Sequence, residues 1–383
     1  MNLAELIRGA DEKMAARDFG GAVSLLEQAA LLQPDDLSLW MRIAAMRRAG
    51  NQPRRALEAV HKALALSPRD FTALLMRASL LQKLEDPDAG EAWGHALAQK
   101  PQSALPEALK PVIAEAEERY ASWQIEQQSR LLQSMAPAEA KADEEQRKRM
   151  ERFCSNTVRR TRPYHSSPTH YHYPELTERE FHPRRLFPWL ERLEAATDTI
   201  TAELRTVMAA ERAELVPYVQ YDDHVPMDQW RPLNHNPDWT AIHLILKGER
   251  IEPNARHCPE TMALLAELNQ PAIAGASPNA MFSLLAPQTL IPPHVGINNA
   301  RLVCHLPLIV PDGCWFRVGA ETRYWKPGQA FVFDDTIEHE AKNPSDELRV
   351  VFIFDVWHPD LSAPERDAVA ALIGSVGLGG DPL

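Results

Sequence analysis

The sequence predicts an α + β protein of several domains. We expect an α-solenoid at the N-terminus and a double-stranded β-helix, or jelly roll, with flanking helices at the C-terminus. Three observations support this prediction. Small and apolar residues recur with a period near 34 up to residue 101. Short strand-like segments follow residue 280, and proline, 31 of 383 residues, gathers after residue 160, which argues against an all-helical chain.

The composition excludes several classes of partner. Lys and Arg number 41 against 53 Asp and Glu, giving a formal net charge of −12, which disfavours binding to phosphate backbones. No apolar run approaches the roughly 20 residues that span a membrane, and the first residues lack signal-peptide features. The four cysteines stand far apart. We therefore expect a cytoplasmic protein with reduced thiols that binds neither nucleic acid nor membrane.

The first 103 residues contain a repeat. Pro34, Pro68 and Pro101 mark its ends, and alanines precede each proline by twelve and five residues. This pattern resembles the tetratricopeptide repeat, in which small residues lie where helices cross. The alternative is a set of generic Ala/Leu-rich helical hairpins. Three repeats must stack to bury their apolar stripes, and such an array is expected to bind a protein partner.

Two connecting segments follow the repeats. Residues 104–160 are charged and helical in pattern, which predicts a capping helix and a charged helical linker. Between residues 162 and 188, proline, histidine and tyrosine dominate. The spacing of His170 and His172 fits metal binding on a strand, but the prolines favour an extended segment that wraps a domain.

Residues 161–370 are predicted to form the second domain, followed by a flexible tail, 371–383. Apolar residues at helical spacing predict a helix over 188–210, and a shorter one is expected over 259–268. Several short segments rich in β-branched and aromatic residues, separated by turn signals, predict a sandwich or barrel. These segments are 280–285, 301–310, 314–318, 322–325, 330–334 and 349–356.

Three residues of the predicted barrel suggest metal chemistry. His294 follows Ile-Pro-Pro at the mouth of a strand, and His339 follows the strand 330–334. Arg349, ten residues after His339, opens an apolar strand, where a cation is costly unless it meets an anion. Imidazole suits Fe(II) with open positions for a bidentate oxo-acid and oxygen. The arginine fork suits the far carboxylate of 2-oxoglutarate.

A fourth polar position lies on the strand 301–310. By period-two alternation, His305 shares one strand face with Arg301 and Val303. His305 can therefore point into the barrel and hydrogen-bond the cosubstrate.

Three long motifs of the second domain together resemble one protein family. The stretches 294–306, 332–340 and 349–359 resemble the aspartyl/asparaginyl β-hydroxylase family, in its bacterial type. The resemblance covers about residues 185–365, and animal members also carry tetratricopeptide repeats before the catalytic domain. It implies a jelly-roll dioxygenase that uses Fe(II), 2-oxoglutarate and O2. The implied residues are His294 and His339 as iron ligands, Arg349 and Ser283 as cosubstrate binders, and His305 and Arg301 as active-site polar residues.

Two positions depart from related patterns. The usual facial triad places a carboxylate two residues after the first histidine, where this chain has Gly296; the family that it resembles also lacks the carboxylate and holds water there. Asp335 is a candidate to hold such a water in the second shell. Val303 stands where animal members have a basic residue, which affects a substrate or cosubstrate contact. Asp238 and Trp239 are candidates to line the substrate cleft.

We therefore expect a dioxygenase that hydroxylates a peptide or protein side chain, Asp or Asn by resemblance, and converts 2-oxoglutarate to succinate and CO2. One alternative is a tetratricopeptide scaffold whose barrel senses 2-oxoglutarate or is inert. Another is a cupin isomerase, or a dioxygenase without cosubstrate, in which Arg349 has no evident role. In a non-catalytic barrel, His294, His305 and His339 would be satisfied polar residues.

Overall fold

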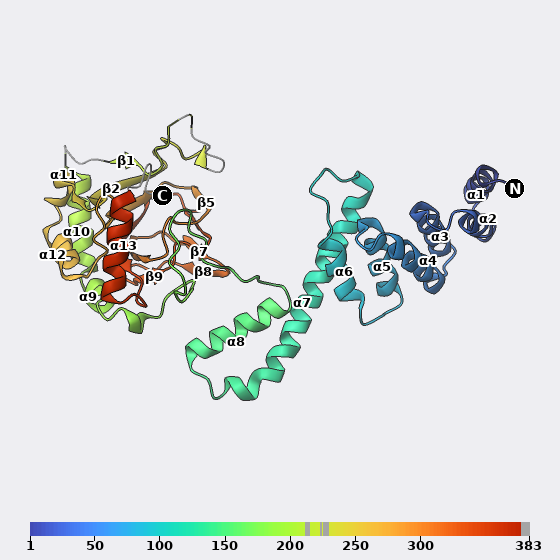
Figure 1. Cartoon of the computed structure of the whole chain (residues 1–383), viewed down its shortest axis with the longest axis horizontal. Helices are drawn as coiled ribbons and strands as arrows, with labels where there is room; N and C mark the ends of the chain where they lie inside the picture. Colours follow the sequence, from blue (N-terminus) through green and yellow to red (C-terminus); the bar gives the residue numbers. More distant parts are fainter. Residues whose placement is uncertain (211–214, 223, 225–229, 377–383) are drawn as a thin grey trace. The chain divides into compact units, whose positions relative to one another are not determined.

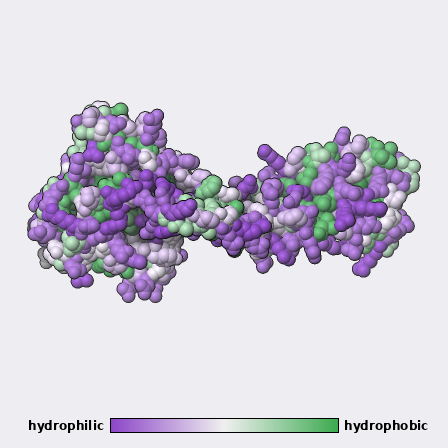
Figure 2. Space-filling model, turned by 90° about the horizontal axis from the view of Figure 1, so that it is seen from below, coloured by the Kyte–Doolittle hydropathy of each residue, from purple (hydrophilic) through white to green (hydrophobic). Residues whose placement is uncertain are grey.

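The computed structural model describes residues 1–210, 215–222, 224 and 230–376. The chain divides into two compact units, Met1–Thr161 and Arg162–Leu383 (Figure 1). Hydrophilic residues cover most of the face shown in Figure 2, with smaller hydrophobic patches between them. No helix among the described residues is long and apolar enough to cross a membrane.

The first unit begins with three helical hairpins that form tetratricopeptide-like repeats. The recurrent alanines of the sequence pattern are buried where the helices cross; Ala22, Ala56 and Ala63 have no exposed surface. A larger side chain at these positions would separate the helices. The helices are α1 (Leu3–Ala15), α2 (Phe19–Leu32), α3 (Leu37–Ala49), α4 (Pro53–Leu66), α5 (Phe71–Lys83) and α6 (Ala89–Leu97).

A long helix packs on the last hairpin. After the short helix η1 (Glu107–Leu109), α7 (Lys110–Glu139) contacts α6 so closely that a Cβ on Gly94 would overlap the Tyr120 ring. α8 (Glu144–Thr157) returns along α7. The C-terminal end of α8 is fixed by Gln124 of α7, whose side chain donates a hydrogen bond of 2.8 Å to the carbonyl of Val158.

The second unit contains two antiparallel sheets. The larger has the strand order β1-β2-β4-β11-β6-β9, with β3 paired to β2, and the smaller has the order β5-β10-β7-β8. From β4 onward, successive strands alternate between the sheets, except that β7 and β8 form a hairpin in the smaller one. The strands are β1 (Val216–Pro217), β2 (Trp239–Leu246), β3 (Glu249–Arg250), β4 (Ala280–Leu285), β5 (Leu290–His294), β6 (Arg301–Ile309), β7 (Trp315–Val318), β8 (Glu321–Tyr324), β9 (Phe331–Phe333), β10 (His339–Lys342) and β11 (Arg349–Trp357).

Helices cover the outer face of the larger sheet. Leu193, Leu204 and Leu265 pack against Phe282 and Phe352 of the sheet in one apolar cluster (Figure 1). This layer fixes the larger sheet, whose opposite face turns toward the smaller sheet. The helices of the unit are η2 (Arg184–Leu186), α9 (Leu190–Ala195), α10 (Thr197–Met208), α11 (Glu252–Ala255), α12 (Pro259–Glu267) and α13 (Ala363–Val376).

The segment before η2 is extended and runs along the strands, as the proline-rich composition predicts. The amides of Thr169 and Tyr171 donate to the carbonyls of Gly296 and Ile297, and the amide of His182 donates to that of Val332. These bonds tie the loop after β5 to the start of the unit.

Several elements differ from the predictions. The helix expected over 188–210 is interrupted at Ala196, which separates α9 from α10. β2, β5 and β10 were not predicted; β5 contains two prolines, which conceal a strand in sequence. The flexible tail expected from residue 371 is wrong in its first part, because α13 continues to Val376 and buries Ile373. Residues 377–383 lie outside the described residues.

Candidate active site

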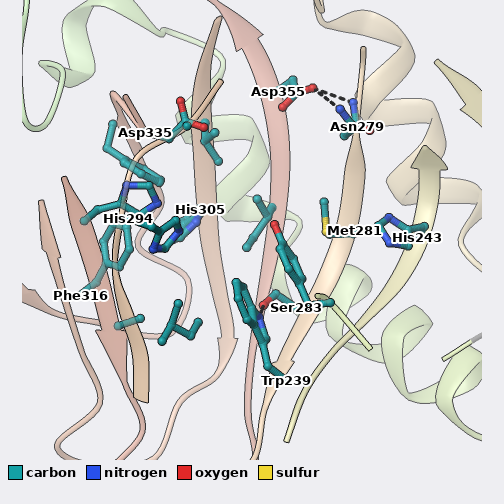
Figure 3. A pocket seen from close by; sticks show the side chains of 18 of the residues that line it. Trp239, His243, Asn279, Met281, Ser283, His294, His305, Phe316, Asp335 and Asp355 are labelled. Carbon is teal, nitrogen blue, oxygen red and sulfur yellow. Dashed lines mark hydrogen bonds between the residues drawn. The ribbon is translucent and has the colours of Figure 1, made fainter. Parts of the chain in front are cut away.

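A cavity of about 220 Å³ lies between the two sheets. Figure 3 shows polar side chains from several strands converging on it. Its wall combines aromatic and aliphatic residues with a few buried polar ones, which is typical of small-molecule sites. The lining residues are Tyr218, Gln220, Trp239, His243, Leu246, Lys247, Asn279, Met281, Ser283, Ile291, His294, Gly296, Arg301, Val303, His305, Phe316, Trp325, Phe333, Asp335, His339, Ala341, Arg349, Ile353 and Asp355.

His294 and His339 face each other in this cavity. They are direct partners in the antiparallel register of β5 and β10, and their ring centroids are 3.9 Å apart. Nδ1 of His294 donates to the carbonyl of Pro292 at 2.8 Å, and Nδ1 of His339 to that of Ile337 at 3.1 Å. Since a carbonyl only accepts, each Nδ1 carries the proton and each Nε2 keeps its lone pair.

Burial also keeps both imidazoles neutral. It lowers the pKa of His294 to about 4 and the pKa of His339 well below its usual value. A neutral imidazole whose other nitrogen is held by a carbonyl is the usual form of a metal ligand. No group of three or more His, Cys, Asp or Glu residues in the described part of the chain is arranged to hold a metal. Two imidazoles alone would leave most coordination positions of a bound metal open to other ligands.

A buried ion-pair network lies beside the histidine pair. Arg301 contacts Oδ2 of Asp335 at 2.9 Å and Oδ1 of Asp355 at 3.5 Å. Asp355 also accepts a hydrogen bond of 2.6 Å from the hydroxyl of Ser277. Figure 3 shows its hydrogen bonds with Asn279, whose backbone amide donates at 2.8 Å. Arg301 thus pairs with one carboxylate in the loop after β9 and one on β11, which fixes its position, while its Nη1 has no hydrogen-bond partner among the described residues.

Asp335 occupies the space above Gly296. The amide of Gly296 donates to the carbonyl of Asp335 at 2.7 Å, and a Cβ on Gly296 would overlap the Asp335 carboxylate. Burial raises the pKa of Asp335, and Arg301 opposes this shift. Oδ1 of Asp335 is buried without a hydrogen-bond partner in the described structure, so it is available to a ligand or to water.

Arg349 is a buried cation without an ionic partner among the described residues. It is 2% exposed, and Nη1 reaches only the carbonyl and hydroxyl of Ser283, at 3.3 and 3.4 Å. Its guanidinium lies 4.7 Å from the centre of the Trp325 ring, and its Nε has no partner. Burial lowers the pKa of Arg349 to about 10, so the group stays charged at neutral pH. A buried, unpaired guanidinium is a site for an anion.

Two further polar side chains lie near Arg349. The hydroxyl of Ser283 accepts a hydrogen bond of 3.1 Å from the indole of Trp239, which stacks on Tyr218. His305 is surrounded by aromatic rings, and its Nδ1 has no partner. Burial, and then the charge of Arg349, lower the pKa of His305 well below its usual value, so this imidazole is a neutral hydrogen-bonding group.

Eight of the nine sequence-predicted site residues line this one cavity. They are Trp239, Ser283, His294, Arg301, His305, Asp335, His339 and Arg349. Asp238 does not: it is exposed outside the lining, and its amide and carbonyl bond Asn236 and Ala286. The substrate role expected for Asp238 is therefore not supported by its position.

The sequence did not indicate several lining residues. His243 and Met281 are direct cross-strand partners on β2 and β4, and Trp325 stacks under Arg349. His243 was missed because β2 was not predicted as a strand. The nearly continuous apolar run of β2, from Trp239 to Leu246, is the signal that could have revealed it. Trp325 ends a predicted strand, and a single aromatic residue there carries no signal of function.

Among solved structures, the chain is similar to the tetratricopeptide domain of Sgt2 from Aspergillus fumigatus. The two are 20% identical with a TM-score of 0.28, and the match covers 33% of this chain and 82% of that one.

Among curated proteins, the chain is 33% identical over 214 residues to human aspartate beta-hydroxylase domain-containing protein 2, covering 55% of this chain and 51% of that protein. It is 35% identical to human aspartyl/asparaginyl beta-hydroxylase over 142 residues, covering 37% of this chain and 18% of that protein. The chain thus spans about half the length of the first of these relatives and less of the second.

The family match covers the domain that contains the cavity. Residues 194–359 match the model of the aspartyl/asparaginyl beta-hydroxylase family. This range contains every strand of both sheets and every residue that lines the cavity. The second unit of this chain therefore contains a domain that matches the aspartyl/asparaginyl β-hydroxylase family.

Proposed function

We propose that this protein is a dioxygenase that depends on Fe(II) and 2-oxoglutarate and hydroxylates a side chain of a peptide or protein. One observation carries the proposal: a pair of neutral imidazoles with free Nε2 atoms shares a cavity with a buried arginine that lacks an anion. A metal would bind the two imidazoles, and a dicarboxylate cosubstrate would supply the anion for the arginine.

The histidine pair fits Fe(II). His294 and His339 would hold the metal through Nε2, each oriented by its own Nδ1 hydrogen bond. When bound, the iron would let O2 oxidise 2-oxoglutarate to succinate and CO2 while the second oxygen atom enters a substrate C–H bond as hydroxyl. Asp335, with its unpartnered Oδ1, would hold a water at the position where a facial triad has its carboxylate.

The other end of the cavity fits 2-oxoglutarate. Arg349 and the hydroxyl of Ser283 would bind the far carboxylate, for which a planar guanidinium offers two parallel N–H donors. His305, on the neighbouring strand β6 of the same sheet, would add a neutral hydrogen bond. This carboxylate would also compensate a charge that is otherwise buried alone, which explains why a cation is retained there.

The fold is proposed to be the double-stranded β-helix of such oxygenases. The alternation of successive strands between the two sheets supports this assignment. We further propose that the helical repeats recruit the protein that carries the substrate side chain, Asp or Asn by resemblance to the matched family.

Succinate formation tests the proposal. The full chain, given Fe(II), ascorbate and 2-oxoglutarate, is expected to release succinate, and His339→Ala is expected to release none. His172→Ala, at an exposed histidine of the same unit, is the matched control and should retain the wild-type rate. Binding of 2-oxoglutarate without succinate formation would contradict the enzyme and favour a sensing barrel.

A further inference from the structure

The charged groups around the histidine pair are already balanced. Among the described residues, five charged side chains line the cavity: the partly exposed Lys247, and Arg301, Arg349, Asp335 and Asp355, which lie deeper. Arg301 is shared by the two carboxylates, at 2.9 and 3.5 Å, so this network of one cation and two anions has a formal charge of −1. Nη1 of Arg301 is buried without a hydrogen-bond partner among the described residues, so it can still donate to an uncharged acceptor such as an amide oxygen. The formal charges of the four deeper groups cancel, as do those of Fe(II) and the 2-oxoglutarate dianion.

The other two cations stand away from the network of Arg301, Asp335 and Asp355. Arg349 is six residues from Asp355 along β11, about 20 Å by the rise of a strand, and it is assigned above to the cosubstrate. Lys247 follows β2, which is separated from β6 by β4 and β11. The backbones of β2 and β6 are therefore about 14 Å apart, with Lys247 at the far side of the cavity.

The wall between these cations is apolar. Val303 lies on β6 between Arg301 and His305, is 7% exposed, and has Phe333 as its direct partner on β9. Met281 and Ile353, which are cross-strand partners, continue this wall. The polar groups on the same side are uncharged; Nδ1 of His243, for example, is buried without a partner.

From this arrangement we infer that the substrate group that reaches the histidine pair is uncharged: an aliphatic or amide side chain, and not a carboxylate. Val303 is the specificity-determining residue, because it is the direct cross-strand partner of Asp355 and lies two residues from Arg301, where a cation would receive a carboxylate. An aspartate side chain would enter as an additional buried anion with no partner. The inference rests on the proposed function and narrows its substrate class.

Peptide pools that differ only in charge provide the test. Each pool contains nine-residue peptides with random flanks and a fixed central Asp, Asn or Leu; Asp and Asn have nearly the same shape. The full chain is immobilised with Zn(II) and 2-oxoglutarate without oxygen, and retained peptides are measured by mass spectrometry. An Asn-centred pool with Asp fixed at the first position has the net charge of the Asp-centred pool and controls for repulsion by the acidic protein.

We expect the Asn-centred or Leu-centred pool to be retained at least tenfold more than the Asp-centred pool. Val303→Lys should move the Asp-to-Asn ratio at least tenfold toward Asp, and Val303→Met, of similar length without charge, should not. Retention of the Asp-centred pool equal to or above both neutral pools overturns the inference, and so does retention of no pool.

A parallel assay separates the two proposals. Succinate released from 2-oxoglutarate and Fe(II) without peptide reports only the proposed function. If it is absent while neutral pools are retained, the dioxygenase proposal fails and the neutral pocket stands. If succinate forms and the Asp-centred pool is preferred, the substrate inference alone fails.

Discussion

The two units bury different kinds of side chain. The first has a core of alanine and leucine, with Ala22, Ala56 and Trp93 at or near full burial. Among its described residues, Gln124 is the one buried amide or charged side chain, and it is hydrogen-bonded; the indole nitrogen of Trp93 is an isolated buried donor without a partner. The second unit buries histidines, carboxylates and arginine between its sheets.

The buried polar groups of the second unit are themselves of two kinds. Glu203, for instance, accepts three hydrogen bonds from Glu260 and Thr261, and therefore fixes the start of α12. Asp335, His305 and Arg349 each keep a buried atom without a partner, and all three lie in the cavity. A buried side chain by itself therefore indicates only packing. Several buried polar groups that lack hydrogen-bond partners and lie in one cavity indicate a ligand site.

The largest expected effect is on the histidine pair. His339→Ala or His294→Ala should lower succinate formation by about a thousandfold, since loss of the metal removes roughly 4 kcal/mol of stabilisation. The melting temperature should hardly change, because both rings lie at strand ends beside open cavity. Turnover that survives both changes would contradict the two-histidine site.

Arg349→Lys should weaken 2-oxoglutarate binding more than it weakens the fold. Lysine keeps the charge but loses the planar fork, and a lost charge-assisted hydrogen bond is worth about 1.5–3 kcal/mol, or roughly tenfold to hundredfold in affinity. Asp355, the alternative partner on the same strand, instead contacts Arg301, Ser277 and Asn279.

Titration with 2-oxoglutarate and thermal unfolding measure these two effects separately. Arg349→Met, which removes the charge, is the control: it should abolish binding without lowering the melting temperature, because an unpaired buried charge is itself destabilising. A large drop in melting temperature for Arg349→Lys, with unchanged affinity, would indicate a structural role.

Gly296→Asp should not improve the enzyme, although it completes a facial triad on paper. The new side chain would overlap the Asp335 carboxylate and add a second negative charge beside it. Overpacking of this kind costs about 1–3 kcal/mol. Gly296→Ala should show the steric part of this loss alone. Higher iron affinity together with equal or greater turnover in Gly296→Asp would show that the glycine has no functional significance.

The smallest effect on turnover is expected in the repeats. Ala56→Leu should destabilise the first unit by about 1–3 kcal/mol, because Ala56 has no exposed surface and lies between packed helices. Succinate formation without a protein substrate should not change. Calorimetry would detect the lower unfolding temperature of the first unit. A matching loss of turnover would show that the activity of the second unit depends on the repeats.

The sequence predicted the elements whose periodicity is clean. The bounds of β4 match the prediction, since all six residues are buried and apolar or small, and the repeat alanines are buried as expected. β5 was concealed by its prolines, and β10, at His339–Lys342, is short and polar. The site residues were found through motifs, whereas the cross-strand register that brings His294 against His339 exists only in the fold.

Anaerobic equilibrium dialysis with Fe(II) tests the metal site most directly, because it needs neither substrate nor turnover. The wild-type chain should bind about one Fe(II) in the presence of 2-oxoglutarate, and the double variant His294→Ala/His339→Ala should bind none, with its melting temperature preserved. Equal binding by the two proteins would contradict the assignment of the histidine pair as the iron site.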